Sequence, residues 1–175
     1  DVAVVEDLKR KENDFKLVQD TLLSKEIPWR WSQNIASGDD PPEKDNFQFV
    51  HALCSNNIVA SNYMEFLEPL TRRLTAKSYV RVKANLRPRT SEIVKSSWHV
   101  DTTELCKTAI FYVNSTNGCT VFRGGTEVKG IENRLLLFDS HIEHAGTSCT
   151  DELRRVVLNI NYHPVKMNGK EQLPL

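Results

Sequence analysis

Two histidines and an aspartate in this sequence have the types and the spacing of metal ligands. His99 and Asp101 are separated by one residue, so both side chains would lie on the same face of a strand. His144 follows a later hydrophobic stretch and would supply a second imidazole from another strand. Two histidines and one carboxylate leave half of an octahedral shell open, which suits ferrous iron that also binds a co-substrate and oxygen. The pattern therefore predicts a non-haem iron site.

The composition limits the class of protein. The chain has 175 residues, which is long enough for one domain with a hydrophobic core. Its 23 basic and 23 acidic side chains balance, so it has no net charge to attract nucleic acid or an anionic membrane. Its apolar runs are far shorter than the roughly 20 residues of a membrane span, and no signal peptide is visible. The four cysteines form no C-x-x-C pair, which indicates reduced thiols and a cytoplasmic location.

The first part of the chain is predicted to be mostly helical. Apolar residues recur at roughly helical spacing over residues 1–26 and again over 62–75. Pro28 would end the first helix, because a proline biases the residue before it out of the helical conformation. The polar segment 32–46, with its glycine and prolines, is predicted to be a loop that could act as a lid. The turn region 87–97 is a second candidate lid.

From residue 78 the hydrophobic pattern changes to the alternation typical of β-strands. Asn117-Gly118 predicts a tight hairpin between two strands, since both residues tolerate positive φ, and Gly124-Gly125 and Gly130 mark further turns. Helices followed by short strands predict a mainly β fold with flanking helices, namely a double-stranded β-helix (a jelly roll, cupin-like) with the N-terminal helices packed on one sheet. The predicted strands are 78–86, 108–114, 119–122, 134–138 and 155–162.

We expect a single domain, residues 1–175. Within it, residues 1–77 would provide helical support and a loop, residues 78–163 the β-helix core, and residues 164–175 a tail.

Five motifs follow one another along the second half of the chain. They are His99-x-Asp101, Asn117-Gly118-Cys119-Thr120-Val121-Phe122, Leu136-Leu137-Phe138-Asp139, His144-Ala145-Gly146 and Arg154-Arg155-Val156-Val157. In this order they resemble the 2-oxoglutarate- and Fe(II)-dependent oxygenases, and most closely the prolyl-hydroxylase-like branch with its bacterial and phage members. The resemblance covers about residues 78–163, and the ordered set is much more specific than any single motif.

This resemblance implies a reaction and a ligand set. His99, Asp101 and His144 would bind Fe(II), and 2-oxoglutarate would chelate the iron through its 2-oxo acid end. Oxygen would bind in the remaining position, and decarboxylation to succinate would accompany hydroxylation of a C–H bond on a peptidyl or small-molecule substrate. Asp101 argues against the halogenating relatives, which lack this carboxylate.

The resemblance also implies an arginine ten or eleven residues after the second histidine, where it pairs with the distal carboxylate of 2-oxoglutarate. Both positions, Arg154 and Arg155, are arginine here. A guanidinium can hold a carboxylate by two parallel hydrogen bonds. Strand alternation places Arg155 with the polar residues Asn159 and Asn161, so we expect Arg155 to bind the carboxylate and Arg154 to be solvated. A register shift of one residue would reverse these two roles.

Three further polar residues are candidates for contacts with the co-substrate or the substrate. They are Asn85, Tyr112 and Thr120, whose strand faces look into the barrel by the resemblance. Each could equally be an ordinary strand position with satisfied hydrogen bonds. Trp29, Trp31 and Trp98 could likewise line a substrate groove or serve in core or rim packing.

The remaining histidines fit the pattern less well. His141 competes with His144, but the small residues after His144 match the family pattern and let the backbone pass close to a metal. We therefore expect His141 to be a surface residue or a neighbour of the ligands, and His51 and His163 to be structural.

Three alternatives stay open. A cupin-like metal enzyme would use a similar barrel without 2-oxoglutarate, and a zinc hydrolase could use the same three ligands. A non-catalytic metal-binding barrel is the third. In every case the balanced charge disfavours a nucleic-acid partner, and no membrane partner is expected.

Overall fold

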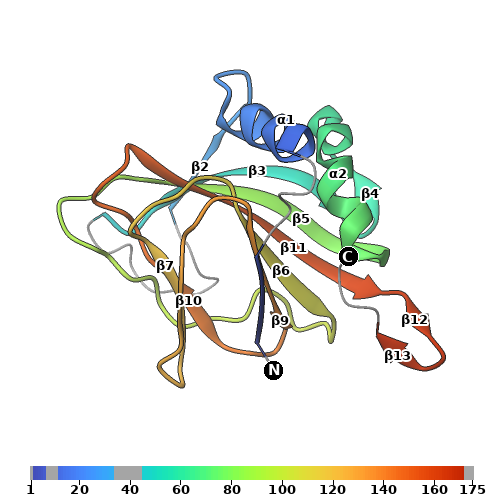
Figure 1. The fold of residues 1–175 in the computed structure, drawn as a ribbon. Helices are drawn as coiled ribbons and strands as arrows, with labels where there is room; N and C mark the ends of the chain where they lie inside the picture. The colour runs from blue at the N-terminus through green and yellow to red at the C-terminus, as the bar shows by residue number, and fades with distance from the viewer. Residues whose placement is uncertain (1, 7–11, 34–44, 172–175) are drawn as a thin grey trace.

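The structure, a computed structural model, describes residues 2–6, 12–33 and 45–171, and its main element is an antiparallel sheet with helices on one face (Figure 1). The strand order is β1-β9-β6-β11-β5-β3-β2, and β4 pairs with the end of β3. These strands are β1 (Ala3–Glu6), β2 (Arg30–Ser32), β3 (Gln48–Ser55), β4 (Ile58–Val59), β5 (Ala76–Pro88), β6 (Lys107–Tyr112), β9 (Arg134–Asp139) and β11 (Arg154–Pro164).

A smaller sheet lies on the opposite face of the large one from the helices (Figure 1). It consists of β10 (His144–Gly146), β7 (Cys119–Phe122) and β8 (Glu127–Lys129), in that order. A short hairpin of β12 (Lys166–Met167) and β13 (Lys170–Glu171) follows β11. The mainly β architecture with helices packed on one sheet is therefore confirmed.

Two hydrophobic cores hold the layers together. The larger lies between the helices and the main sheet and includes Val82, Ala84, Leu158 and Ile160, all fully buried. The smaller lies between the two sheets and includes Phe122 and Phe138, whose rings meet edge to face at 5.1 Å. Because side chains alternate along a strand, the residues of β5 and β11 that do not enter the larger core face the space between the sheets. That space is where the functional site forms.

The helices are shorter than predicted. Residues 3–6 were expected to be helical but form the edge strand β1, which pairs with β9 from Ala3↔Leu137 to Glu6↔Arg134. The run of β-branched residues Val4 and Val5 favours a strand, and pairing with β9 overrides the helical spacing. The helix α1 itself spans Glu12–Leu23.

The second helical stretch is broken into three parts, 3-10 helix Asn62–Leu67, α2 (Glu68–Thr71) and 3-10 helix Arg72–Leu74. Pro69 lies at the start of α2, where its missing N–H removes no helical hydrogen bond. Gln48–Ser55, which was not predicted as a strand, is β3 and pairs with β5.

The predicted hairpin at Asn117-Gly118 is wrong. β6 lies in the large sheet between β9 and β11, whereas β7 pairs with β10 and β8 in the small sheet. The chain therefore crosses from one sheet to the other at this point. The turn predicted at Gly124-Gly125 does connect a hairpin, between β7 and β8, and Gly125 has a φ of 88°.

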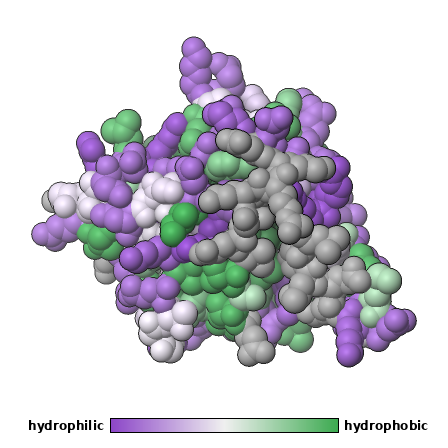
Figure 2. All heavy atoms as spheres, in the orientation of Figure 1, coloured by the Kyte–Doolittle hydropathy of each residue, from purple (hydrophilic) through white to green (hydrophobic). Residues whose placement is uncertain are grey.

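The surface of the face seen in Figure 1 is mainly hydrophilic at its rim, with hydrophobic residues gathered below its centre (Figure 2). Among the described helices, none has the length and apolar character needed to cross a bilayer. All four cysteines are free thiols.

Candidate metal centre

The two histidines of the predicted ligand set are joined through their backbones. The His99 N–H donates to the His144 carbonyl and the His144 N–H donates to the His99 carbonyl, both at 3.0 Å. This isolated antiparallel bridge connects the segment after β5 to β10. The imidazole centroids lie 4.7 Å apart. Residues far apart in sequence are thus fixed as neighbours by the main chain.

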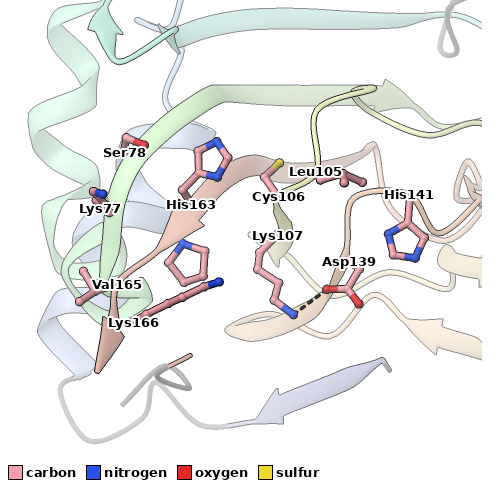
Figure 3. A pocket seen from close by; sticks show the side chains of 11 residues that line it. Lys77, Ser78, Leu105, Cys106, Lys107, Asp139, His141, His163, Val165 and Lys166 are labelled. Carbon is pink, nitrogen blue, oxygen red and sulfur yellow. Dashed lines mark hydrogen bonds and ion pairs between the residues drawn. The ribbon is translucent and has the colours of Figure 1, made fainter. Parts of the chain in front are cut away.

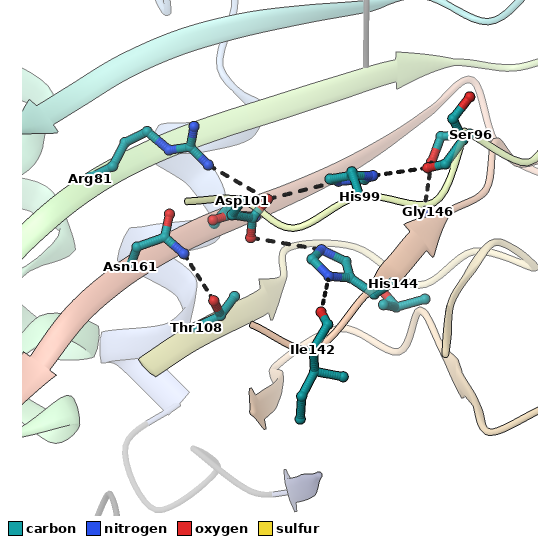
Figure 4. Close-up of polar contacts among 12 residues, drawn as sticks. Arg81, Ser96, His99, Asp101, Thr108, Ile142, His144, Gly146 and Asn161 are labelled. Atoms are coloured by element: carbon teal, nitrogen blue, oxygen red, sulfur yellow. Dashed lines mark hydrogen bonds and ion pairs between the residues drawn. The ribbon is translucent and has the colours of Figure 1, made fainter. Parts of the chain in front are cut away.

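Hydrogen bonds aim one nitrogen of each imidazole at the same point (Figure 4). The Nδ1 of His99 lies 2.9 Å from the Ser97 carbonyl, and the Nδ1 of His144 lies 3.1 Å from the Ile142 carbonyl. A carbonyl only accepts, so both Nδ1 atoms carry the proton and both Nε2 atoms present a lone pair. Such a fixed tautomer is typical of metal-binding histidines.

Asp101 is the third member of the group, and its carboxylate faces the Nε2 atoms of both histidines. Its Oδ1 lies 3.8 Å from the Nε2 of His99 and its Oδ2 lies 3.7 Å from the Nε2 of His144. Potential ligand atoms of the three residues all lie within 4.8 Å of one another, and no other such group occurs in the part of the chain that the structure describes. Two imidazoles and a carboxylate at this separation fit one ion of the non-haem iron type.

Neighbouring residues orient the Asp101 carboxylate and favour its ionised form. The Asn159 amide donates to its Oδ2 at 2.9 Å, and the Arg81 guanidinium lies 3.5 Å from its Oδ1. Burial alone would raise the pKa of Asp101, but His144, Asn159 and Arg81 together hold this pKa below its usual value. Burial lowers the pKa of His144, against the opposing effect of Asp101, so the His144 imidazole is neutral near pH 7. An ionised carboxylate and a neutral imidazole are the forms that bind a metal.

The triad lies in a pocket that also contains Arg155. The pocket is lined by Gln48, Lys83, Asn85, Arg87, His99, Asp101, Ile110, Thr120, His144, Gly146, Arg155, Val157 and Asn159. Arg155 is 5% exposed, and no carboxylate of the described residues pairs with it. Its Nη2 lies 3.5 Å from the Cys119 carbonyl, its guanidinium lies 5.6 Å from the centre of the Tyr112 ring, and its Nε has no hydrogen-bond partner. A buried guanidinium with unused donors fits a bound carboxylate.

Gly118 passes unusually close to this arginine. A Cβ at this position would lie 2.7 Å from the Cδ of Arg155 and 2.6 Å from the Ser148 carbonyl oxygen. Both separations are shorter than real contacts, so only glycine fits here without displacement. The Asn117-Gly118 signal therefore has a different cause from the hairpin that the sequence predicted.

The other predicted site residues fall into two groups. Asn85 and Thr120 line the pocket, and the Tyr112 hydroxyl donates to Thr120 Oγ1 at 2.7 Å beneath Arg155. Arg154 lies on the opposite face of β11, where its Nη2 donates to the Leu23 carbonyl at 2.7 Å. Strand alternation thus places Arg155, and not Arg154, in the pocket.

The predicted minor residues are placed as follows. His141 is exposed and His163 lies 2.6 Å from the Glu104 carboxylate, both away from the triad. His51 lies 2.7 Å from the Ser61 hydroxyl and 3.1 Å from the Pro28 carbonyl. Trp98 is flanked by Lys95, 4.6 Å above its ring.

The two candidate lids differ. Residues 34–44 of the predicted loop 32–46 lie outside the described residues. The segment after Arg87 is fastened to the strand region that follows His144, because Ser96 N–H donates to the Gly146 carbonyl and Ser148 N–H donates to the Val94 carbonyl. This segment therefore forms a fixed wall beside the metal centre.

Sequence reasoning missed two cations that line the pocket, Lys83 and Arg87. Both lie on β5, opposite Asn159 and Arg155 respectively. Arg87 donates to the Gly146 carbonyl at 3.0 Å and to Asn46 Oδ1 at 3.2 Å. Burial and the nearby Arg155 lower the pKa of Arg87 to about 9, so it stays charged at neutral pH. The signal was present, because alternation along β5 puts both residues on the polar face.

Burial lowers the pKa of Lys83 to about 8, assisted by Arg81 and opposed by Asp101. The folded-state pKa lies below the unfolded one, so the charged ammonium destabilises the folded protein at every pH below about 8, and this penalty fades as the pH rises further. We expect Lys83→Met to raise the free energy of unfolding of the metal-free protein by about 2 kcal/mol at neutral pH. Urea unfolding at about pH 7 and about pH 10 tests this. A gain that fails to shrink at the higher pH would contradict it.

A larger cavity of about 1020 Å³ lies beyond the triad on the same face of β11 (Figure 3). His163 of β11 lines this cavity. His163 is four positions after Asn159, the residue beside the triad, so the cavity begins about 13 Å along the strand from Asn159. Lys107 and Asp139 form an ion pair at 2.6 Å in its wall. Among the described residues it contains no metal-ligand group, so its size does not make it the reactive centre.

Comparison with known proteins gives the fold. No protein-family model and no curated protein matches the sequence. Many solved structures do match, among them three that align along nearly the whole chain. A prolyl hydroxylase from Trichoplax adhaerens, in complex with a hypoxia inducible factor oxygen degradation domain peptide fragment, is 12% identical over 92% of this chain and 83% of its own, with a TM-score of 0.62.

The other two are bacterial. A 2OG-Fe(II) oxygenase family oxidoreductase from Burkholderia pseudomallei is 10% identical over 98% of this chain and 89% of its own, with a TM-score of 0.63. A prolyl-4-hydroxylase from Pseudomonas putida is 10% identical over 94% and 93%, with a TM-score of 0.57. The chain therefore has the double-stranded β-helix fold of the 2-oxoglutarate- and Fe(II)-dependent oxygenases.

Proposed function

We propose that this chain is an Fe(II)- and 2-oxoglutarate-dependent dioxygenase that hydroxylates a peptidyl or small-molecule substrate. The observation that carries the proposal is the presence in one pocket of His99, Asp101 and His144 with converging ligand atoms, together with a buried Arg155 that no described carboxylate pairs. The fold shared with oxygenases of this type supports it. One similar protein is solved with a peptide, which is why a peptidyl substrate is one of the two classes proposed.

Each pocket residue has a distinct task under this proposal. His99, His144 and Asp101 would hold the iron, with Asn159 keeping the Asp101 carboxylate in place. Iron with 2-oxoglutarate and oxygen supplies the oxidising power for C–H hydroxylation. Arg155 would bind the distal carboxylate of 2-oxoglutarate by paired hydrogen bonds.

The remaining lining residues shape the space. The Tyr112 ring supports the Arg155 guanidinium from below, and burial raises the pKa of Tyr112 so that its hydroxyl stays protonated. Ile110 and Val157, both buried, are the two large apolar side chains in an otherwise mostly polar lining, and they would limit the access of water to the reacting centre. Asn85 and Thr120 would contact the co-substrate beside these side chains.

The test is succinate formation from 2-oxoglutarate by protein loaded with Fe(II) under anaerobic conditions and then exposed to oxygen. We expect Arg155→Ala to raise the half-saturating concentration of 2-oxoglutarate by about 100-fold, because truncating one side of a buried charge pair costs several kcal/mol. Arg154→Ala is the matched control and should leave it within about twofold, since Arg154 bonds only outside the pocket.

Two outcomes would refute parts of the proposal. Equal succinate formation by wild type and Arg155→Ala, with Arg154→Ala impaired, would remove Arg155 from the co-substrate site. No succinate from any of them, with zinc retained in preference to iron on metal analysis, would favour hydrolytic zinc chemistry instead.

A further inference from the structure

The metal pocket holds more positive charge than its proposed contents require. Three cations line it, Lys83, Arg87 and Arg155, against the single carboxylate of Asp101. Fe(II) and the doubly charged 2-oxoglutarate cancel each other, and the Asp101 carboxylate is paired with Arg81, a cation outside the lining. The three positive charges of the lining are left over, in a place where uncompensated burial is costly.

The three cations are spread along the pocket and do not form one cluster. Arg87 and Arg155 face each other across the β5–β11 pair, at the end where the distal carboxylate would bind. Lys83 lies opposite Asn159, the residue that holds Asp101, and so is at the metal end. Lys83 and Arg87 are four positions apart on β5, which is about 13 Å along the strand.

Lys83 also differs from the two arginines in its partners. Arg87 donates to two oxygens of the protein, whereas within residues 2–6, 12–33 and 45–171 no hydrogen bond or ion pair engages the Lys83 ammonium. Arg81, the next cation on the same face, is already engaged by Asp101 at 3.5 Å. Of the three cations that line the pocket, Lys83 is therefore the one at the metal end, and its ammonium has no partner among the described residues. Arg81 also has an unpaired Nε, but it does not line the pocket.

Resting on the proposed function, we infer that the hydroxylated substrate carries an anionic group, a carboxylate or a phosphate, and that Lys83 binds this group beside the metal. The ammonium offers three donors to such an anion from a flexible stem. An anion in this place supplies the missing counter-charge. It also fixes the orientation of the C–H bond relative to the iron site, which makes Lys83 a specificity-determining residue.

Small probes of matched size test the inference directly. The protein is loaded with Mn(II) in place of Fe(II) and saturated with 2-oxoglutarate, and acetate, methyl phosphate or neutral acetamide is titrated in. The paramagnetic ion speeds the proton relaxation of any probe that binds near it. We expect a saturable effect for an anion and none for acetamide, and the stronger anion identifies the group as carboxylate or phosphate.

Variants distinguish the contribution of Lys83 to anion binding from that of other positive charges. Lys83→Met should weaken the affinity for the anionic probe about tenfold, because a charge-assisted hydrogen bond typically contributes a free energy of that size. Lys83→Arg should retain most of the affinity. Lys129→Met, at an exposed strand lysine of β8, is the control and should not change it.

Three results would overturn the inference. One is equal relaxation by acetate and acetamide, and another is an anion effect unchanged in Lys83→Met. The third is a Lys83→Met protein that loses 2-oxoglutarate affinity instead of anion affinity, since Lys83 would then serve the co-substrate. Failure of the wild type to bind 2-oxoglutarate at all, seen in the loading titration, would instead refute the proposed function on which the inference rests.

Discussion

Replacement of Asp101 by alanine is expected to lower both Fe(II) affinity and succinate formation by more than about 100-fold. Loss of an outer partner of a metal ligand commonly costs about 10–100-fold, and Asp101 would be a ligand itself. Its removal leaves two neutral nitrogen donors, and it also leaves the Asn159 amide and the Arg81 guanidinium without their acceptor. The remaining site has no negative charge with which to hold a divalent ion.

A graded series makes this prediction specific. Asn159→Ala keeps the Asp101 carboxylate but removes the hydrogen bond that orients it, so a loss within about 10–100-fold is expected. Asp20→Ala removes an exposed carboxylate paired with Lys16 on α1 and should change neither quantity. Equilibrium dialysis with Fe(II) under argon measures affinity, and circular dichroism confirms folding. Wild-type affinity in Asp101→Ala would exclude the triad as the metal site.

The proximity of His99 and Asp101 within the candidate ligand set was predictable because it depends only on local spacing. The i, i+2 spacing of His99 and Asp101 places both on one side of an extended chain, and no distant contact is needed to see it. The same alternation correctly separated Arg155 from Arg154. The sequence could not show the backbone bridge between His99 and His144, since which strands become neighbours depends on the packing of the whole barrel.

The misplaced elements share a physical cause, which is tertiary pairing that overrides local signals. Residues 3–6 are a strand because β9 offers them an open edge. The pairing of β5 with β11 is irregular between Arg81↔Asn161 and Tyr79↔Tyr162. This irregularity turns Tyr79 toward the helices, where its hydroxyl lies 3.4 Å from the Thr71 carbonyl. Strict alternation along the strand, without this irregularity, would place Tyr79 on the polar face with Arg81.

Gly118→Ala is expected to impair the protein more than any other single methyl group added to a glycine of the described chain. The new Cβ would lie 2.6 Å from a backbone oxygen of Ser148 and 2.7 Å from the stem of Arg155. The backbone yields little, so Arg155 must move from the pocket. Overpacking of this kind costs about 1–3 kcal/mol, which lowers Tm by several degrees. A displaced guanidinium should also raise the half-saturating 2-oxoglutarate concentration about tenfold or more.

Gly124→Ala supplies a control that differs only in its surroundings. A Cβ on Gly124 would have no heavy atom within 4 Å, so stability and 2-oxoglutarate dependence should both remain as in the wild type. Thermal unfolding and succinate formation on both variants separate two explanations for Gly118. Gly118 does not have a positive φ, so the alternative to the Arg155 contact is the close approach to the Ser148 carbonyl. If only that contact mattered, Arg155 would be undisturbed and only Tm would fall. If the close approach to Arg155 matters, the half-saturating 2-oxoglutarate concentration rises in Gly118→Ala and not in Gly124→Ala. An unchanged value in Gly118→Ala would show that this contact does not hold the arginine in place.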